Sequence, residues 1–101
     1  MTSFVILLGG DLTVTARLRQ QIRGARVIAA DSGMMHASAL GLVPELWVGD
    51  FDSAGSELAI QYAEVPREIF AVEKDATDGA IAVAAAITRG ATRILLAGGL
   101  G

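Results

Sequence analysis

Residues 26–33 read Arg26-Val27-Ile28-Ala29-Ala30-Asp31-Ser32-Gly33. Four apolar residues follow one another without the polar alternation of a half-exposed strand, and an aspartate comes directly after them. A continuous apolar run of this kind is typical of a strand covered on both faces of a parallel sheet. The stretch therefore predicts a buried parallel strand whose carboxyl end opens into a polar loop.

The same pattern recurs along the chain and predicts a sheet of several such strands. The predicted strands are Ser3–Leu8, Arg26–Ala30, Glu45–Val48, Glu68–Val72 and Arg93–Ala97. Helical spacing lies between them, in a helix carrying Val14, Leu18 and Ile22 and then in Met34–Leu40, Leu58–Tyr62 and Thr77–Arg89, the last ended by Gly90. Alternating strands and helices with short connections predict an α/β fold. We expect a three-layer α/β/α sandwich with an open, mainly parallel, doubly wound sheet.

The composition is that of one folded domain. The chain has 101 residues, of which 52% are hydrophobic and 19% charged, which argues against disorder. A net charge of −3 does not favour the binding of a negatively charged nucleic acid. With no cysteine and one histidine, His36, to which we assign no role, Cys-based zinc sites and multi-histidine sites are excluded. No apolar run is long enough to span a membrane, and we expect a cytoplasmic protein.

The aspartates are concentrated at the ends of the predicted strands. Each lies just past one of the first four strands, at Asp11, Asp31, Asp50, Asp52, Asp75 and Asp78. The five glutamates show no such focus. Because ligands of open α/β sheets bind outside the carboxyl ends of the strands, the aspartates predict a ligand site at that edge.

Helix capping is a simpler explanation for some of these residues, since Asp and Ser are favoured N-caps. Asp11 is expected to cap the first helix, with Thr13 as a competitor. Asp31 or Ser32 could cap the second helix, and for Asp31 a cap and a functional role are equally supported. Asp75 and Asp78 have the spacing of a capping box.

Capping accounts poorly for Asp50 and Asp52 together, because one helix start needs one cap. At positions i and i+2 of an extended chain, both carboxylates would point to the same side and repel each other. Mg²⁺ prefers carboxylate oxygens together with substrate phosphates. We therefore predict a Mg²⁺–phosphate site centred on residues 49–53, joined by Asp75 and Asp78 if the fourth strand lies near the third.

Other residues near these aspartates favour a phosphate ligand. Lys74, the only lysine of the chain, is next to Asp75 and is expected to contact phosphate or pair with an acid. Helix N-termini at Gly33 and Thr77 would add backbone N–H groups. Gly98-Gly99 would allow close approach of a ligand after the fifth strand. Neither a G-x-G-x-x-G nor a Walker A sequence is present, so a standard dinucleotide fold and a P-loop are not supported.

Taken together, these blocks resemble the catalytic domain of thiamine pyrophosphokinase in order, spacing and placement at strand ends. The blocks are Ala30-Asp31-Ser32-Gly33, Gly49-Asp50-Phe51-Asp52-Ser53, Lys74-Asp75-Ala76-Thr77-Asp78 and Gly98-Gly99. The resemblance implies a homodimeric, Mg²⁺-dependent enzyme that transfers diphosphate from ATP to the hydroxyl of thiamine, giving thiamine diphosphate and AMP. It also implies that Asp50, Asp52, Asp75 and Asp78 hold Mg²⁺ and position the ATP phosphates. Asp31, Ser32 and Gly33 would lie near the nucleotide.

Two parts of the family pattern are missing from residues 1–101. The glycine-rich block normally continues into an Arg and an Asp-His pair, and members carry a C-terminal β-rich domain that helps to bind thiamine. In addition, Ser32 replaces a glycine that is common in the family. We therefore expect residues 1–101 to be the ATP- and Mg²⁺-binding catalytic domain without its C-terminal partner.

Two alternatives stay open at this point. One is a related pyrophosphokinase that acts on a pterin alcohol, and the other is a non-catalytic nucleotide-binding module of the same fold, as in some sporulation proteins. A sugar transferase with an Asp-x-Asp metal site is disfavoured by the block Lys74–Asp78. A haloacid-dehalogenase-type phosphatase would place its Asp-x-Asp pair on the first strand instead of after the third.

Overall fold

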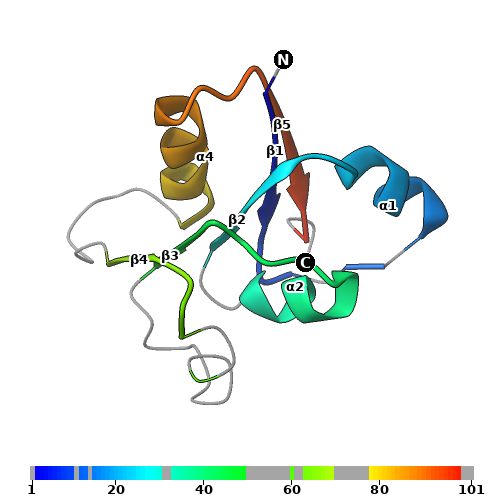
Figure 1. Cartoon of the computed structure of the whole chain (residues 1–101), viewed down its shortest axis with the longest axis horizontal. Coiled ribbons are helices and arrows are strands. Elements are labelled where there is room, and N and C mark those ends of the chain that lie inside the picture. Colours follow the sequence, from blue (N-terminus) through cyan, green and yellow to red (C-terminus); the bar gives the residue numbers. More distant parts are fainter. Residues whose placement is uncertain are drawn as a thin grey trace.

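The structure, a computed structural model, describes residues 2–10, 12–13, 15–30, 33–49, 60, 63–69 and 78–98. The strands within these residues are β1 (Ser3–Leu7), β2 (Arg26–Ala30), β3 (Leu46–Gly49), β4 (Arg67–Ile69) and β5 (Arg93–Ala97). The helices are α1 (Ala16–Ile22), α2 (Met34–Leu40) and α4 (Asp78–Thr88) (Figure 1).

The strands form one sheet in the order β4-β3-β2-β1-β5. Every neighbouring pair is parallel, with β1 between β2 and β5. All carboxyl ends therefore lie at one edge of the sheet, and all amino ends lie at the other. The predicted open parallel sheet is confirmed.

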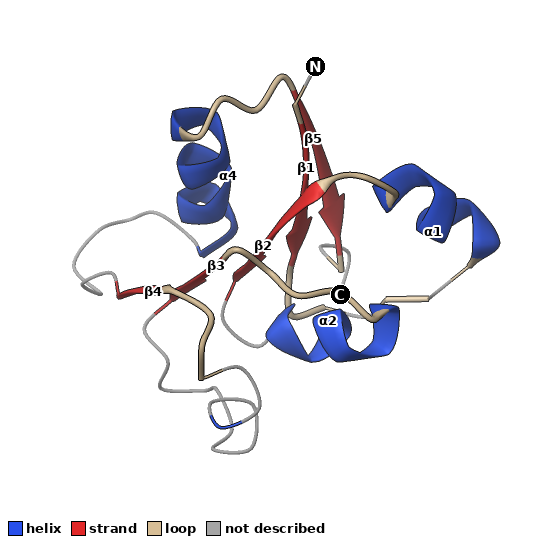
Figure 2. Ribbon diagram, in the orientation of Figure 1, coloured by secondary structure: helices blue, strands red, loops and turns tan. Residues whose placement is uncertain are grey.

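Helices cover both faces of this sheet (Figure 2). On one face, Val5, Leu7 and Trp47 are fully buried in a cluster that also contains Ile22 of α1 and Met34 of α2. On the other face, strand residues pack against two alanines of α4, in a cluster made of Phe4, Ile6, Ile28, Ala30, Leu46, Val48, Ala82 and Ala86. Alternate residues of one strand thus serve opposite layers, which explains the continuous apolar runs. The predicted three-layer α/β/α sandwich is confirmed.

The cap of the first helix differs from the predicted one. The N-cap of α1 is Thr15, whose Oγ1 accepts a hydrogen bond from the backbone N–H of Leu18 at 3.1 Å, so the prediction of Asp11 or Thr13 as the cap was wrong. Before α2, Gly33 has helical dihedrals, with φ of −58° and ψ of −18°, and the predicted caps Asp31 and Ser32 lie outside the described residues. A Cβ at Gly33 would overlap the carbonyl oxygen of Leu7, and this close contact explains why glycine occupies this position.

Most of the remaining predicted boundaries agree with the structure to within one residue. β2, β5 and α2 have the predicted limits, whereas β3 and β4 are offset by one residue at their described ends. Gly90, with φ of 94°, follows the last turn of α4 as predicted. Of the predicted helix Leu58–Tyr62, only Ile60 lies within the described residues, and residues 70–72 of the predicted fourth strand lie outside them. In the part of the chain that the structure describes, no helix has the length and apolar character needed to cross a membrane.

Candidate functional site

The carboxyl ends of β3 and β4 lie side by side. In their parallel pairing, Gly49 is aligned with Ile69, and each is the last residue of its strand. In the sequence, Asp50 follows Gly49 directly, and Asp75 and Asp78 come six and nine residues after Ile69. The chain segments that carry the two predicted acidic pairs therefore leave the sheet from neighbouring points.

The described residues that follow these two strands lie on opposite faces of the sheet. After β3, the chain passes Val65, which is buried in the cluster beneath α1 and α2. After β4, it continues to α4, which packs on the other face. In open α/β sheets, ligands bind outside the carboxyl ends of the strands. Gly49 and Ile69 lie at that edge of the sheet, which favours the predicted site there.

The orientation of α4 brings its first residue to the same edge. At the far end of this helix, Arg89 Nη1 lies 2.8 Å from Glu45 Oε2, and the Arg89 carbonyl accepts a hydrogen bond from Arg26 Nη1 at 3.4 Å. Arg26 begins β2, so the helix ends at the amino edge of the sheet. Its 11 residues rise by about 16 Å. The main chain of Asp78 consequently lies toward the carboxyl edge, as predicted.

Two glycines of the predicted nucleotide-binding set pack against the end of β1. A Cβ at Gly33 would overlap the backbone of Leu7, and one at Gly98 would overlap the carbonyl oxygen of Leu8. The N–H of Leu8 donates a 2.7 Å hydrogen bond to the carbonyl of Ala97, which holds the ends of β1 and β5 together. Gly98 also has φ of 82°, a backbone angle that residues other than glycine rarely adopt. The two glycines therefore allow main-chain segments to meet at close range.

His36 joins this assembly, although no role was assigned to it from the sequence. Its Nε2 lies 2.8 Å from the carbonyl oxygen of Gly10, and the residue is only 9% exposed. No local pattern could have predicted this contact, because the two residues are 26 positions apart.

The other predicted site residues lie outside the described residues. They are Asp31, Ser32, Asp50, Asp52, Lys74, Asp75, Thr77 and Gly99. Within the described stretches, no three acidic or histidine residues form a group that could hold a metal ion. The four-carboxylate site accordingly stays a prediction, which the pairing of β3 with β4 and the orientation of α4 favour.

The sequence of the chain matches the family model of the thiamin pyrophosphokinase catalytic domain over residues 19–101. The chain belongs to this family. The match includes all four blocks on which the resemblance was based. A comparison with curated proteins gave no match.

Solved thiamin pyrophosphokinases have the same fold. The enzyme from Geobacillus thermodenitrificans is 28% identical and superposes with a TM-score of 0.78, over 100% of this chain and 48% of that one. The enzyme from Bacillus subtilis is 24% identical with a TM-score of 0.78, over 99% of this chain and 48% of that one. Thiamin pyrophosphokinase from Candida albicans is 18% identical with a TM-score of 0.62, over 81% and 30% of the two chains. The chain thus spans about half the length of the two bacterial proteins.

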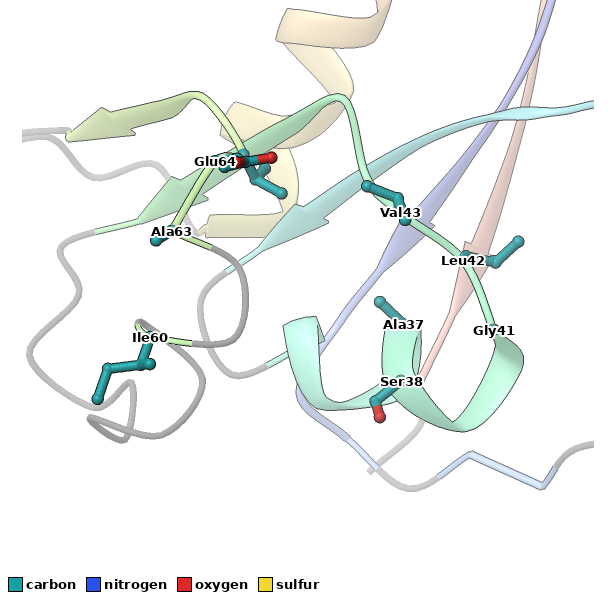
Figure 3. A pocket seen from close by; sticks show the side chains of 9 residues that line it. Ala37, Ser38, Gly41, Leu42, Val43, Ile60, Ala63 and Glu64 are labelled. Atoms are coloured by element: carbon teal, nitrogen blue, oxygen red, sulfur yellow. The ribbon is translucent and has the colours of Figure 1, made fainter.

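One groove of this thiamin pyrophosphokinase domain lies away from the predicted site. It has a volume of about 650 Å³ and lies between the second half of α2 and the connection from β3 to β4 (Figure 3). Its lining is mostly apolar, with Ala37, Ser38, Gly41, Leu42, Val43, Ile60, Ala63, Glu64 and Val65. Gly33 and Gly98, predicted site residues that the structure describes, do not line it.

Proposed function

We propose that the protein containing this chain is a thiamin pyrophosphokinase, which transfers the diphosphoryl group of ATP to the hydroxyl of thiamine. The observation that carries the proposal is the side-by-side ending of β3 and β4 at Gly49 and Ile69 in a chain of this family. This pairing favours the gathering of the two acidic segments at one crevice. The likeness to solved thiamin pyrophosphokinases supports the same reaction.

The residues expected at the crevice suit Mg²⁺. Asp50, Asp52, Asp75 and Asp78 would supply carboxylate oxygens, the ligands that this cation takes together with substrate phosphates. Four carboxylates near a polyphosphate would repel it without a cation, and Lys74 alone offsets one charge. When bound, Mg²⁺ would neutralise the charge that develops on the phosphoryl oxygens.

The nucleotide would lie along the ends of β1, β2 and β5. Gly33 and Gly98 let the main chain at these strand ends pack closely on Leu7 and Leu8, which brings together the segments that would border the nucleotide. Asp31, Ser32, Thr77 and Gly99 would border the same space. This chain would thereby bind ATP, the donor of the diphosphate group.

The reaction would be an in-line displacement at the β-phosphorus of ATP. A bond forms between the thiamine hydroxyl oxygen and the β-phosphorus, and the bond from that phosphorus to the oxygen bridging the α- and β-phosphates breaks. AMP leaves with the bridging oxygen, and the hydroxyl proton passes to a carboxylate or to water. Catalysis of this type depends mainly on positioning and on charge neutralisation, the tasks proposed for the aspartates and Lys74.

The resemblance also leads us to propose a homodimer that works in the cytoplasm, where ATP is available. Sedimentation of the full-length gene product would test the dimer. A monomeric protein with full activity would contradict it.

The deciding measurement is AMP release by the full-length gene product with ATP and Mg²⁺, with thiamine in one reaction and a pterin alcohol in a parallel one. We expect AMP and thiamine diphosphate only with thiamine. AMP formed only with the pterin would overturn the acceptor assignment. Failure of both acceptors would favour a non-catalytic nucleotide-binding module.

A further inference from the structure

We propose that His36 is a positioning residue that fixes the Gly9-Gly10 main chain against Gly98, and thereby shapes the wall of the nucleotide site. The inference rests on the proposed function, which places ATP at this edge. It concerns a side chain that neither the acidic cluster nor the family resemblance includes.

The direction of the hydrogen bond follows from its chemistry. The Gly10 carbonyl oxygen can only accept, so His36 Nε2, 2.8 Å away, carries the proton and donates it. His36 is 9% exposed, so water has limited access to its side of this bond. Loss of the donor would leave the part-buried Gly10 carbonyl without this partner, which costs more than the bond itself contributes.

The backbone of His36 lies in a tightly packed turn of α2. Gly33 packs directly on the Leu7 backbone, and Met34 and Ala37 on either side of His36 are fully buried. The histidine therefore projects from a fixed turn of α2. Its position relative to the end of β1 is set by the core.

The ring of His36 also contacts the end of β5. A Cβ added to Gly98 would lie 3.3 Å from His36 Cδ2 and 3.2 Å from the Gly10 carbonyl oxygen. The Leu8 carbonyl oxygen is closer still, at 2.4 Å, so the imidazole is one of three groups packed around residue 98. One ring connects three chain segments, namely the loop after β1, the first turn of α2 and the end of β5.

Such a connection matters because Gly9 and Gly10 have no side chains of their own to fix their conformation. Glycine has the largest range of backbone conformations, and a glycine pair next to a polyphosphate would need an external contact to keep one of them. His36 supplies that contact. It acts on the nucleotide only through the main chain, so we expect it to affect ATP binding more than the chemical step.

The test compares two substitutions of one side chain in the full-length gene product. His36→Gln places an amide N–H near the position of Nε2 and retains the donor, whereas His36→Leu keeps a similar volume without it. We expect His36→Leu to raise the KM for Mg²⁺–ATP about tenfold, the equivalent of about 1.4 kcal/mol, with kcat and the KM for thiamine changed by less than about twofold. His36→Gln should stay within about twofold of the wild type in all three.

Glu45→Gln is the matched control, because it removes a charged hydrogen-bond partner at the opposite, amino edge of the sheet. It should lower the melting temperature and leave the KM for ATP unchanged. If His36→Leu changes the melting temperature but not this KM, the residue is only structural and the inference fails. Equal losses for His36→Leu and His36→Gln would also overturn it.

Calorimetric titration of the same proteins with Mg²⁺–ATP separates this inference from the proposed function. A wild type that binds Mg²⁺–ATP but releases no AMP would overturn the proposed reaction. The role of His36 would then be tested by the dissociation constant for Mg²⁺–ATP, which should rise about tenfold in His36→Leu and stay within about twofold in His36→Gln. A wild type that does not bind Mg²⁺–ATP would overturn both.

Discussion

Gly49 and Ile69 are aligned partners at the ends of two parallel strands, β3 and β4. Val65, on the connection that follows β3, is buried on one face of the sheet, and α4, which follows β4, packs on the other face. In the sequence, Asp50 and Asp52 come within three residues of the end of β3. Asp75 comes between β4 and α4, and Asp78 is the first residue of α4. The pairing of Gly49 with Ile69 therefore favours a shared metal site for four aspartates that lie far apart in the sequence.

Asp52→Asn tests that joint role. The substitution removes one charged metal ligand while keeping the size of the side chain, so Mg²⁺-dependent AMP formation should fall by at least about a hundredfold, the scale seen when one electrostatic contact to a transferring group is lost. The melting temperature should stay within a few degrees of the wild type. AMP release at saturating Mg²⁺ and a thermal scan are the measurements.

Glu64→Gln provides the control for charge alone. Glu64 is an exposed carboxylate on the connection from β3 to β4, and its neutralisation should leave activity unchanged. If Asp52→Asn retains activity, the metal assignment is wrong. If both variants lose activity equally, the effect reflects net charge instead of a ligand.

The sequence predicted the central strands well because they are covered on both faces. β2 has the predicted limits, since its apolar run from Val27 to Ala30 is buried throughout. β5 also has the predicted limits, although it lies at the edge of the sheet and its Leu96 is 53% exposed. The helix starts were harder. Thr15 caps α1 although Asp11 and Thr13 carry equally suitable oxygens, because the helix begins where its apolar face meets the sheet, and only the folded chain determines that point.

The site was predictable only in part, for a related reason. Aspartates that follow apolar runs can be found by inspection, because strand ends are local features. The roles of Gly33 and His36 depend on which strand end each one meets, namely the Leu7 backbone and the Gly10 carbonyl. Those contacts join residues 26 positions apart and have no local signature.

Gly33→Ala is expected to destabilise the fold by about 3 kcal/mol, the upper part of the range for overpacking a tight core contact. Its φ of −58° suits alanine, so backbone strain plays no part. The whole effect would come from overlap with the Leu7 carbonyl. Urea denaturation of both proteins measures the difference.

The matched control for this prediction is Gly41→Ala. Gly41 has φ of 69° and nothing within 4 Å of an added Cβ, so the loss should be about 1 kcal/mol from backbone conformation alone. Equal losses for the two variants would show that the contact of Gly33 with β1 is not tight.

His36→Leu and Gly98→Ala should be coupled in a double-mutant cycle. A Cβ at Gly98 crowds His36 Cδ2, so the two changes act on one contact. Their combined effect on the KM for ATP should differ from the sum of the single effects by at least about 0.5 kcal/mol, the lower limit for residues in contact. Additive effects would mean that the ring and the glycine act separately.

Glu45 forms the centre of an ion-pair group at the amino edge. Arg26 donates from Nε to Oε1 at 2.5 Å and from Nη2 to Oε2 at 2.6 Å, and Arg89 donates from Nη1 to Oε2 at 2.8 Å. The hydrogen bonds from Arg26 are the largest cause that holds the pKa of Glu45 below its ordinary value of 4.5, and the hydrogen bond from Arg89 lowers it further. The group ties α4 to β2 and to the start of β3.

Glu45→Gln should therefore destabilise the protein in a pH-dependent way. A carboxyl with a lowered native pKa contributes stability that is fully present above 4.5, its unfolded value, and that is lost as the pH falls through the native pKa. Because Glu45 is 26% exposed, the difference in unfolding free energy between wild type and variant should be at most about 1 kcal/mol at pH 7. It should shrink toward zero once the pH falls below the native pKa. Urea titrations from pH 7 to pH 3 measure it, with Glu64→Gln as the exposed control. A difference that stays constant over this range would mean that Glu45 acts through packing and not through its charge.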